Sequence, residues 1–407
     1  MENPEVVILG LGYIGLPTAA LIARNKVKVL GVDINQHVVD TVNRGEIHIA
    51  EPLLKEEIEV AVQDGYLSAA TQPMAANTYL IVVPTPFKGR NEPDVSFVRS
   101  AINSVLPFLQ KGNLLIIEST SPVGTTEKMS ELIFSERPEL VGHIHLAYCP
   151  ERVLPGNVMY ELINNDRVIG GIGQASTDAA VSFYRRFVNS ELFATNAKTA
   201  EMCKLVENSS RDVQIAFANE LSIICDKADI NVWELIGLAN KHPRVNILQP
   251  GCGVGGHCIA VDPYFIVSEY PIETKIIGTA REVNNYKSFW CAEKVENAKL
   301  RFELEHGRKP KMAIMGLAFK PNIDDLRESP AKYIAQKILQ NAKNDETHFI
   351  VEPNIDDHSI FKLTDLKVAA DQADIVIILV AHDEFKELAF DDQKWVLDFA
   401  GVRKGEV

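Results

Sequence analysis

The chain has 407 residues, enough for two or three domains, and its formal net charge is -14. An acidic chain is a poor partner for nucleic acid, although a local basic pocket can still receive a phosphorylated ligand. No apolar run approaches the roughly 20 residues of a membrane span, and the first residues lack the basic and apolar regions of a signal peptide. Six cysteines without a CxxC pair indicate a reducing compartment, so we expect a cytoplasmic protein.

The first part of the chain predicts a βαβ unit. An apolar strand at Val6–Leu9 is followed by the glycine-rich segment Gly10–Gly15, and a helix is expected from Leu16 to about Asn25. A second strand, Lys28–Val32, ends immediately before Asp33. Further strands at 79–83, 114–117 and 145–148, with helical patterns between them, predict a parallel doubly wound sheet.

Three glycines in this unit suggest a dinucleotide site. Gly10, Gly12 and Gly15 have the G-x-G-x-x-G spacing between a strand and a helix, where backbone N–H groups hold a pyrophosphate. Asp33 is placed to accept from both ribose hydroxyls and would repel a 2′-phosphate, which favours NAD over NADP. A tight turn alone would explain the glycines, but the agreement of strand, helix and Asp33 favours the cofactor.

The middle and the end of the chain differ from its start. Apolar residues at spacings of three and four predict one long helix from Ala197 to about Ala228, and a second helical region covers about 276–305. New strands at 312–315, 348–351 and 374–380 predict a second, smaller α/β region. We therefore expect an α/β protein with two Rossmann-like doubly wound parallel-sheet domains, residues 1–196 and 307–407, joined by a central helical domain, residues 197–306.

The most informative segment is Pro250–Asp262, in which four glycines and a proline surround Cys258. Glycine permits close backbone approaches, so this thiol is expected to face a ligand instead of filling a core. A thiol can add to an aldehyde, and hydride loss then gives a thioester that water cleaves to an acid. Cys252 on the same segment is a rival by composition alone. His257 either lowers the pKa of the thiol or serves as a shape or hydrogen-bonding residue.

Polar residues follow three expected strand ends of the first domain, at 84–86, 118–125 and 149–151. Ligands of such sheets bind outside the carboxyl ends of the strands, so Thr120 and Glu151 are candidate water-handling groups. Helix capping is the alternative for each.

Basic side chains mark two further places. Lys204 and Asn208 share one face of the long helix and suit an oxyanion, although a solvated Lys is the simpler interpretation. In the C-terminal domain, Lys320 and Arg327 follow a strand and a turn, and they are candidate anion partners in a second nucleotide site.

Together these motifs resemble the UDP-glucose/GDP-mannose dehydrogenase family from end to end. The matching segments are 10–17, 83–86, 118–124, 250–262 and 316–330. Segments 31–35, 148–156, 199–204, 242–246 and 255–263 are most similar to the bacterial members that oxidise UDP-N-acetyl-D-mannosamine. The sequence departs from the family pattern at Cys252, and segments 137–145 and 341–346 look shorter than in relatives.

The resemblance implies a reaction. It is a four-electron oxidation of the C6 hydroxyl of a UDP-N-acetylhexosamine to a carboxylate with two NAD, by a homodimer that works in polysaccharide biosynthesis. UDP-N-acetyl-D-mannosamine is the first substrate, and UDP-N-acetylglucosamine or UDP-glucose is the alternative. A two-electron hydroxy-acid dehydrogenase is the competing class, and it needs no cysteine. No metal is implied.

The resemblance also implies roles for named residues. Cys258 is the nucleophile, Lys204 and Asn208 stabilise oxyanions, Thr120 and Asp262 position water or relay protons, and Glu151 assists thioester hydrolysis. The cofactor contacts are Gly10, Gly12, Tyr13, Ile14, Gly15, Asp33, Thr85, Thr120 and Arg327. The substrate contacts are Glu151, Arg152, Lys204, Asn208, Arg244, Gly255, His257 and Lys320, with Arg244 reaching across a dimer interface.

Overall fold

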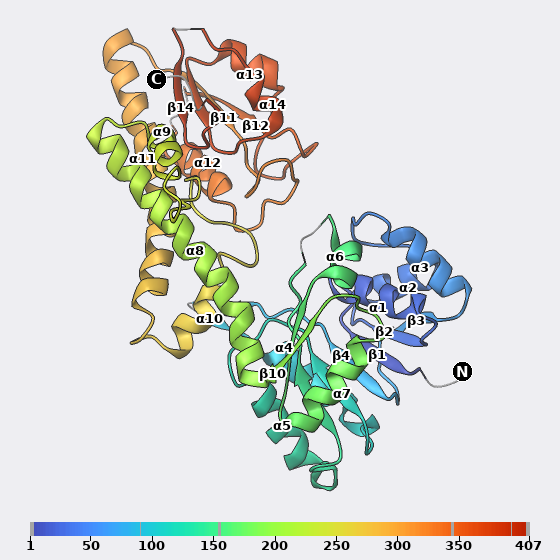
Figure 1. Cartoon of the computed structure of the whole chain (residues 1–407). Coiled ribbons are helices and arrows are strands. Elements are labelled where there is room, and N and C mark those ends of the chain that lie inside the picture. Colours follow the sequence, from blue (N-terminus) through green and yellow to red (C-terminus); the bar gives the residue numbers. More distant parts are fainter. Residues whose placement is uncertain (1–3, 90, 154–155, 343–345, 392, 404–407) are drawn as a thin grey trace. The chain divides into compact units, whose positions relative to one another are not determined.

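The computed structural model describes residues 4–89, 91–153, 156–342, 346–391 and 393–403. The chain divides into two compact units (Figure 1). Unit 1 is Met1–Glu207 with Tyr264–Glu269, and unit 2 is Asn208–Pro263 with Tyr270–Val407. The division falls within two helices, α8 (Ala197–Ala228) and α10 (Asp262–Glu269).

Unit 1 is built on an eight-stranded sheet in the order β10-β9-β8-β7-β4-β1-β2-β3. The strands are β1 (Val6–Leu9), β2 (Val29–Val32), β3 (Leu67–Ala70), β4 (Thr78–Ile81), β7 (Leu114–Ile117), β8 (His145–Tyr148), β9 (Arg167–Gly171) and β10 (Leu192–Asn196). All neighbours are parallel except β8 and β9, which pair antiparallel. A two-stranded hairpin, β5 (Phe87–Lys88) and β6 (Glu92–Pro93), stands apart from this sheet.

Helices cover both faces of the unit 1 sheet. They are α1 (Gly15–Arg24), α2 (Gln36–Asn43), α3 (Leu54–Gln63), α4 (Ser96–Val105), α5 (Thr125–Glu136), α6 (Val158–Asn164) and α7 (Gln174–Tyr184), with short 3-10 turns at Leu106–Phe108 and Pro138–Leu140. Side chains of β1 alternate between two cores: Val6 and Ile8 pack with α1, whereas Val7 and Leu9 pack with α4. Because both faces are covered, the strand is apolar at every position, which is the pattern read from the sequence.

Unit 2 combines helices with a second parallel sheet. The helices are the later part of α8, α9 (Val232–Ala239), α11 (Lys275–His306), α12 (Pro330–Gln340), α13 (Leu366–Gln372) and α14 (Asp383–Lys386). The sheet order is β12-β11-β13-β14, formed by β11 (Lys311–Met315), β12 (Thr347–Val351), β13 (Ile375–Ile378) and β14 (Trp395–Asp398). Buried residues of α11 pack on one face of this sheet, and α13 covers the other.

The expected fold class is confirmed: two Rossmann-like sheets and a long central helix. The long helix has the bounds that the apolar spacing predicted. Strands β3, β9, β10 and β14 were not predicted, and the reversal at β9 makes the first sheet mixed at one side. The expected shortening at 341–346 falls partly on residues 343–345, which lie outside the described residues.

Candidate active site

The turn after β1 is shaped for close approach by a ligand. Gly10 has φ +96°, and a Cβ on it would lie 2.2 Å from the carbonyl oxygen of Val82. A Cβ on Gly15 would lie 1.9 Å from the carbonyl oxygen of Gly10, whereas the place of a Cβ on Gly12 is open. Two glycines therefore allow the turn to form, and the third leaves room above the start of α1 for a pyrophosphate.

Asp33 lies beside this turn, at the end of β2. Its Oδ2 accepts from the backbone N–H of Leu11 at 3.0 Å, and its Oδ1 accepts from Asn35 N at 2.9 Å. Both bonds fix the carboxylate while leaving each oxygen able to accept from a ribose hydroxyl. Tyr13 is exposed and Ile14 half-buried in the turn, and Thr85 follows β4, the neighbour of β1. These residues fit NAD, which supplies a hydride acceptor when bound.

A buried ionic cluster lies behind the strand ends that carry Thr120 and Glu151. Arg167 Nη1 pairs with Glu151 Oε2 at 3.1 Å, and its guanidinium lies 4.9 Å from the ring centre of Tyr184. The Tyr184 hydroxyl donates to Glu118, whose pKa burial raises to about 7 despite the attraction of Arg167. Sequence reasoning did not select Arg167 or Tyr184, because β9 and α7 carry no motif.

The segment that contains Thr120 is tied to the first turns of α8. Glu201 is fully buried and accepts from the backbone N–H groups of Gly124 and Thr126, the latter at 2.8 Å. Lys204 follows one turn later on the same helix. Arg152 is held separately: its Nη1 pairs with Glu207 Oε1 at 2.6 Å.

In unit 2, Cys258 and two of its expected partners lie together. The backbone N–H of Asp262 donates to the carbonyl oxygen of Cys258 at 2.8 Å, which closes one turn around the thiol-bearing residue. Asn208 Nδ2 donates to Asp262 Oδ2 at 2.5 Å. Cys258 is exposed, whereas Asp262 is buried. The α8 amide and the start of α10 are thus brought to the same loop as the thiol.

A buried polar seam between α8 and α11 holds the loop from one side. Asn219 Oδ1 accepts from Gly251 N at 2.9 Å, and Ser288 Oγ donates to the carbonyl oxygen of Cys252 at 2.8 Å. Behind them, Asn219 donates to Asn284 at 2.8 Å, and Asn284 donates to Asp212, which also pairs with Arg281.

The two cysteines of the loop differ in their surroundings. Cys252 is buried in the core of unit 2, and a hydrogen bond with Cys291 together with burial raises the pKa of its thiol well above the ordinary value. Cys258 is exposed. Since the thiolate is the nucleophile, the buried Cys252 is the poorer candidate.

The other side of the loop packs against the segment that carries Lys320 and Arg327. A Cβ on Gly255 would lie 2.6 Å from the carbonyl oxygen of Glu328, and Gly256 N donates to the carbonyl oxygen of Arg327 at 3.2 Å. This close packing is the physical reason for glycine at these positions. Lys320 is exposed, and Arg327 is exposed and pairs with Asp325 at 2.6 Å.

His257 and Arg244 are the remaining residues that were expected to contact the substrate. His257 is exposed, and partial desolvation together with the neighbouring Arg327 lowers the pKa of its imidazole. A neutral ring cannot lower the pKa of the adjacent thiol by charge, and the role of His257 stays a prediction. Arg244 is exposed in the segment between Asn240 and Ile247. The Asn240 side chain holds the end of this segment: Nδ2 donates to the carbonyl oxygen of Ile247 at 3.0 Å, and Oδ1 accepts from Ile247 N at 2.7 Å.

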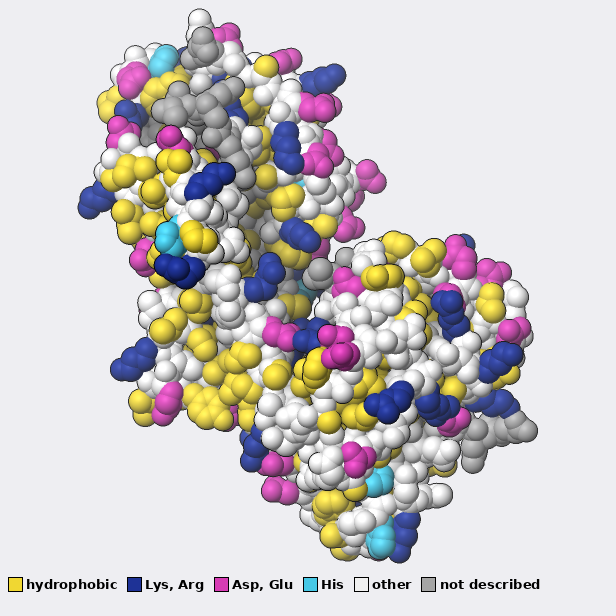
Figure 2. Space-filling view, in the orientation of Figure 1, with side chains coloured by type: hydrophobic (Ala, Val, Ile, Leu, Met, Phe, Trp, Pro, Cys, Tyr) yellow, Lys and Arg dark blue, Asp and Glu magenta, His cyan; other side chains and the backbone are white. Residues whose placement is uncertain are grey.

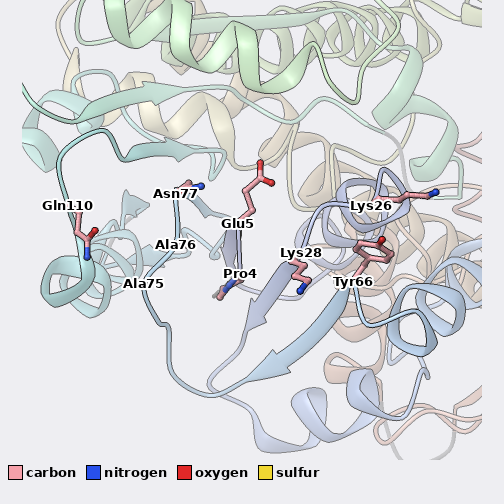
Figure 3. Close-up of a pocket in the computed structure, with 9 residues that line it drawn as sticks. All are labelled: Pro4, Glu5, Lys26, Lys28, Tyr66, Ala75, Ala76, Asn77 and Gln110. Atoms are coloured by element: carbon pink, nitrogen blue, oxygen red, sulfur yellow. The ribbon is translucent and has the colours of Figure 1, made fainter. Parts of the chain in front are cut away.

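A hollow of about 390 Å³ lies elsewhere in unit 1 (Figure 3). Its lining includes Glu5, Lys28 and Asn77, which directly precede β1, β2 and β4. It is therefore at the amino ends of the strands, opposite the Gly10 turn.

In the described ranges no group of three or more His, Cys, Asp or Glu is arranged to hold a metal ion. None of the described helices is long and apolar enough to cross a membrane.

The turn, its acid and the doubly wound sheet are those of a dinucleotide-binding protein, and with the exposed Cys258 they fit an NAD-linked oxidoreductase. Models of the UDP-glucose/GDP-mannose dehydrogenase family match three ranges: the NAD binding domain at 4–188, the central domain at 198–286 and the UDP binding domain at 313–404. The chain belongs to this family, and it is an NAD-dependent UDP-sugar dehydrogenase.

Individual relatives cover nearly the whole chain. The UDP-N-acetyl-D-mannosamine dehydrogenase of Escherichia coli (strain K12) is 54% identical, with 99% of this chain and 100% of the relative covered. The NDP-N-acetyl-D-galactosaminuronic acid dehydrogenase of Ralstonia nicotianae is 49% identical, with 98% and 96% covered. Among solved structures, the UDP-N-acetyl-mannosamine dehydrogenase Cap5O from S. aureus has a TM-score of 0.85 at 39% identity, with 98% and 99% covered.

Proposed function

We propose that the protein oxidises UDP-N-acetyl-D-mannosamine at C6 to UDP-N-acetyl-D-mannosaminuronate, with two NAD consumed per sugar. The observation that carries this proposal is the exposed Cys258 on a loop held from both sides, because a two-electron dehydrogenase needs no such thiol. The sugar is proposed from relatives of that specificity at 54% identity across the chain.

The first two electrons leave C6 as a hydride while the hydroxyl gives up its proton, which yields an aldehyde. We assign Thr120 of unit 1 and Asp262 of unit 2 to the positioning of water or the relay of protons. The sulfur of Cys258 then adds to the aldehyde carbon, and Lys204 and Asn208 stabilise the oxyanion of the thiohemiacetal. Departure of a second hydride leaves a thioester.

Hydrolysis completes the reaction. Water adds to the thioester carbon, Glu151 takes its proton, and the carbon–sulfur bond breaks to release the acid and the Cys258 thiolate. The ion pair with Arg167 supports this role, since it holds the Glu151 carboxylate in one orientation. We assign the remaining cofactor contacts to Tyr13, Ile14, Thr85 and Arg327, and the substrate contacts to Arg152, Arg244, Gly255, His257 and Lys320.

We further propose a cytoplasmic homodimer in which residues 1–196 bind NAD, 197–306 form the central domain and 307–407 bind UDP, and whose product feeds polysaccharide biosynthesis. Exposed apolar side chains in unit 2 support an interface: Phe217 and Ile224 on α8, Leu238 on α9 and Phe289 on α11 are 47% to 64% exposed. Hydrophobic side chains reach the surface at several points in this helical part (Figure 2). Isolated apolar residues are normal on a surface, but several on packed helices favour association.

A comparison of substrates tests the proposal. We expect kcat/KM to be highest with UDP-N-acetyl-D-mannosamine among UDP-N-acetylhexosamines, UDP-glucose and GDP-mannose, with two NADH formed per sugar. UDP-N-acetyl-D-galactosamine belongs in the panel because of the Ralstonia relative. A higher kcat/KM with another sugar would overturn the substrate, and one NADH per substrate would overturn the reaction.

A further inference from the structure

The two sheets carry an acid in the same topological place. Asp33 follows β2, the parallel neighbour of β1, and Glu352 follows β12, the parallel neighbour of β11. Each acid accepts from the residue after a glycine of nearly equal φ, +96° at Gly10 and +95° at Gly316. Asp33 accepts from one N–H of its turn, whereas Glu352 Oε2 accepts from Leu317 N at 2.7 Å and Ala318 N at 2.9 Å.

The second turn is therefore unsuited to hold phosphates by its backbone. The N–H groups of Leu317 and Ala318 are already occupied by the buried Glu352 carboxylate, and that of Phe319 donates to the carbonyl oxygen of Asp325. In unit 1 a helix starts at Gly15, but in unit 2 the next helix, α12, starts only at Pro330. Without a helix start behind the turn, an anion in this place has to be held by side chains of the intervening loop. Lys320 is the exposed cation nearest the turn in sequence.

The loop is also held at a second point. His382 follows β13, and its side chain is fully buried against Glu352, with Nε2 at 3.2 Å from Oε2. Its Nδ1 accepts from the backbone N–H of Asn322 at 2.9 Å, so the proton of a neutral ring belongs on Nε2, where it is donated to Glu352. Asn322 and Asp383 exchange two further bonds, of 2.8 and 3.0 Å. The segment 317–322 is thus fixed on both sides of Lys320.

We propose that Glu352 and His382 are positioning residues that hold segment 317–322 so that Lys320 meets the diphosphate of the UDP-sugar. The ligand rests on the proposed function, and the two residues act on it only through the loop. Burial would raise the pKa of Glu352, but its bonds to His382 and the turn outweigh burial and lower that pKa to about 2, so the carboxylate stays charged. The same arrangement leaves Leu317 N and Ala318 N unavailable to a pyrophosphate.

Three variants of the full-length protein test the inference by calorimetric titration with UDP and with NAD, and by steady-state kinetics. Glu352→Gln should raise the Kd for UDP and the KM for the UDP-sugar about tenfold, the loss of about one charged hydrogen bond. The Kd for NAD, bound in unit 1, and kcat at saturating UDP-sugar should stay within about twofold of wild type.

His382→Gln and His382→Asn separate positioning from folding. A Gln amide reproduces the donor at Nε2, so Glu352 stays paired while Asn322 N loses its acceptor. An Asn oxygen reproduces the acceptor at Nδ1. We expect His382→Gln to weaken UDP binding about tenfold and His382→Asn to retain most affinity. Equal UDP affinities in these two variants would overturn the inference, even if Glu352→Gln does not fold.

Asp374→Asn is the matched control. Asp374 accepts from Arg308 and from Lys311 N at the amino end of the same sheet. This variant therefore loses an ion pair in the same domain, but at a distance from segment 317–322. Its UDP affinity should equal that of wild type, and a loss as large as that of Glu352→Gln would point to general destabilisation. If the wild-type protein itself fails to bind UDP, the proposed function fails instead. A folded Glu352→Gln variant with unchanged UDP affinity would count against this inference alone.

Discussion

At the residue scale, the two cysteines of the glycine-rich loop differ in accessibility. Cys258→Ser should lose nearly all acid formation, because an alcohol is a far weaker nucleophile than a thiolate, while NAD binding persists. A slowly hydrolysed ester on the introduced serine is expected by mass spectrometry. Cys252→Ser should retain most activity, since Cys252 packs in the core. A fully active Cys258→Ser variant together with a dead but folded Cys252→Ser variant would reverse the assignment.

Glu118 gives a residue-scale prediction about pH. Its pKa is raised from 4.5 to about 7 in the folded protein, so the folded state holds a proton that the unfolded chain releases. The free energy of unfolding should therefore fall as pH rises from about 4.5 to about 7, by up to about 3 kcal/mol. Glu118→Gln, which is neutral throughout, should gain that much relative to wild type between pH 5 and pH 8 in urea unfolding. A difference independent of pH would show that Glu118 is charged in the fold.

Asp33 determines the cofactor prediction. Its carboxylate is fixed by Leu11 N and Asn35 N, and a 2′-phosphate beside it would meet like charge. We expect kcat/KM for NAD to exceed that for NADP by at least about tenfold, and Asp33→Asn to narrow the ratio. Equal use of both cofactors by the wild-type protein is the result that would contradict it.

At the element scale, the seam between α8 and α11 supports the cysteine loop. Asn219→Leu removes the acceptor of Gly251 N and leaves Asn284 with one partner fewer, so the loop loses a fixed point. We expect a loss in kcat of about tenfold or more with little change in the Kd for NAD, measured by stopped-flow and titration. Lys294→Met, at an exposed ion pair between the same helices, should leave kcat unchanged.

The elements that the sequence predicted well are those with one dominant pattern. Strand β1 is an uninterrupted apolar run, and helix α8 has apolar residues at spacings of three and four. The structure gives both elements the expected bounds. Strand β10 is half exposed and polar in part, so it has no such pattern. No local sequence feature indicates that β9 runs antiparallel to β8. Asp33 is predictable because it follows a predicted strand. Glu352 also follows one, so the same signal could have found it.

The interior partners of the site could not be predicted. Arg167 is adjacent in space to Glu151 because β9 pairs with β8, and the sequence does not disclose that pairing. The contacts of Asn219 with Asn284 similarly require the register of α8 against α11. Roles taken from the family covered the residues expected to face ligand, whereas the residues that hold them depend on tertiary packing.

At the scale of the whole molecule, the apolar side chains exposed on the helices of unit 2 predict association. Phe217 and Ile224 lie on α8, both 54% exposed. We expect a dimer mass by light scattering, and the double variant Phe217→Glu with Ile224→Glu should shift it toward the monomer, because burying two carboxylates is unfavourable. A monomer mass for the wild-type protein at working concentration would remove the basis for an interface.

The burial of the other thiols has a practical consequence for chemical labelling. All six cysteines are described, and Cys258 is the one that is exposed; Cys203 is half-buried and the remaining four are buried. A mild alkylating reagent used at one equivalent should therefore modify the folded chain mainly at a single place, which peptide mapping can verify. The fraction of chains tagged then counts competent sites in a preparation, and protection by a bound nucleotide sugar reports occupancy without any turnover.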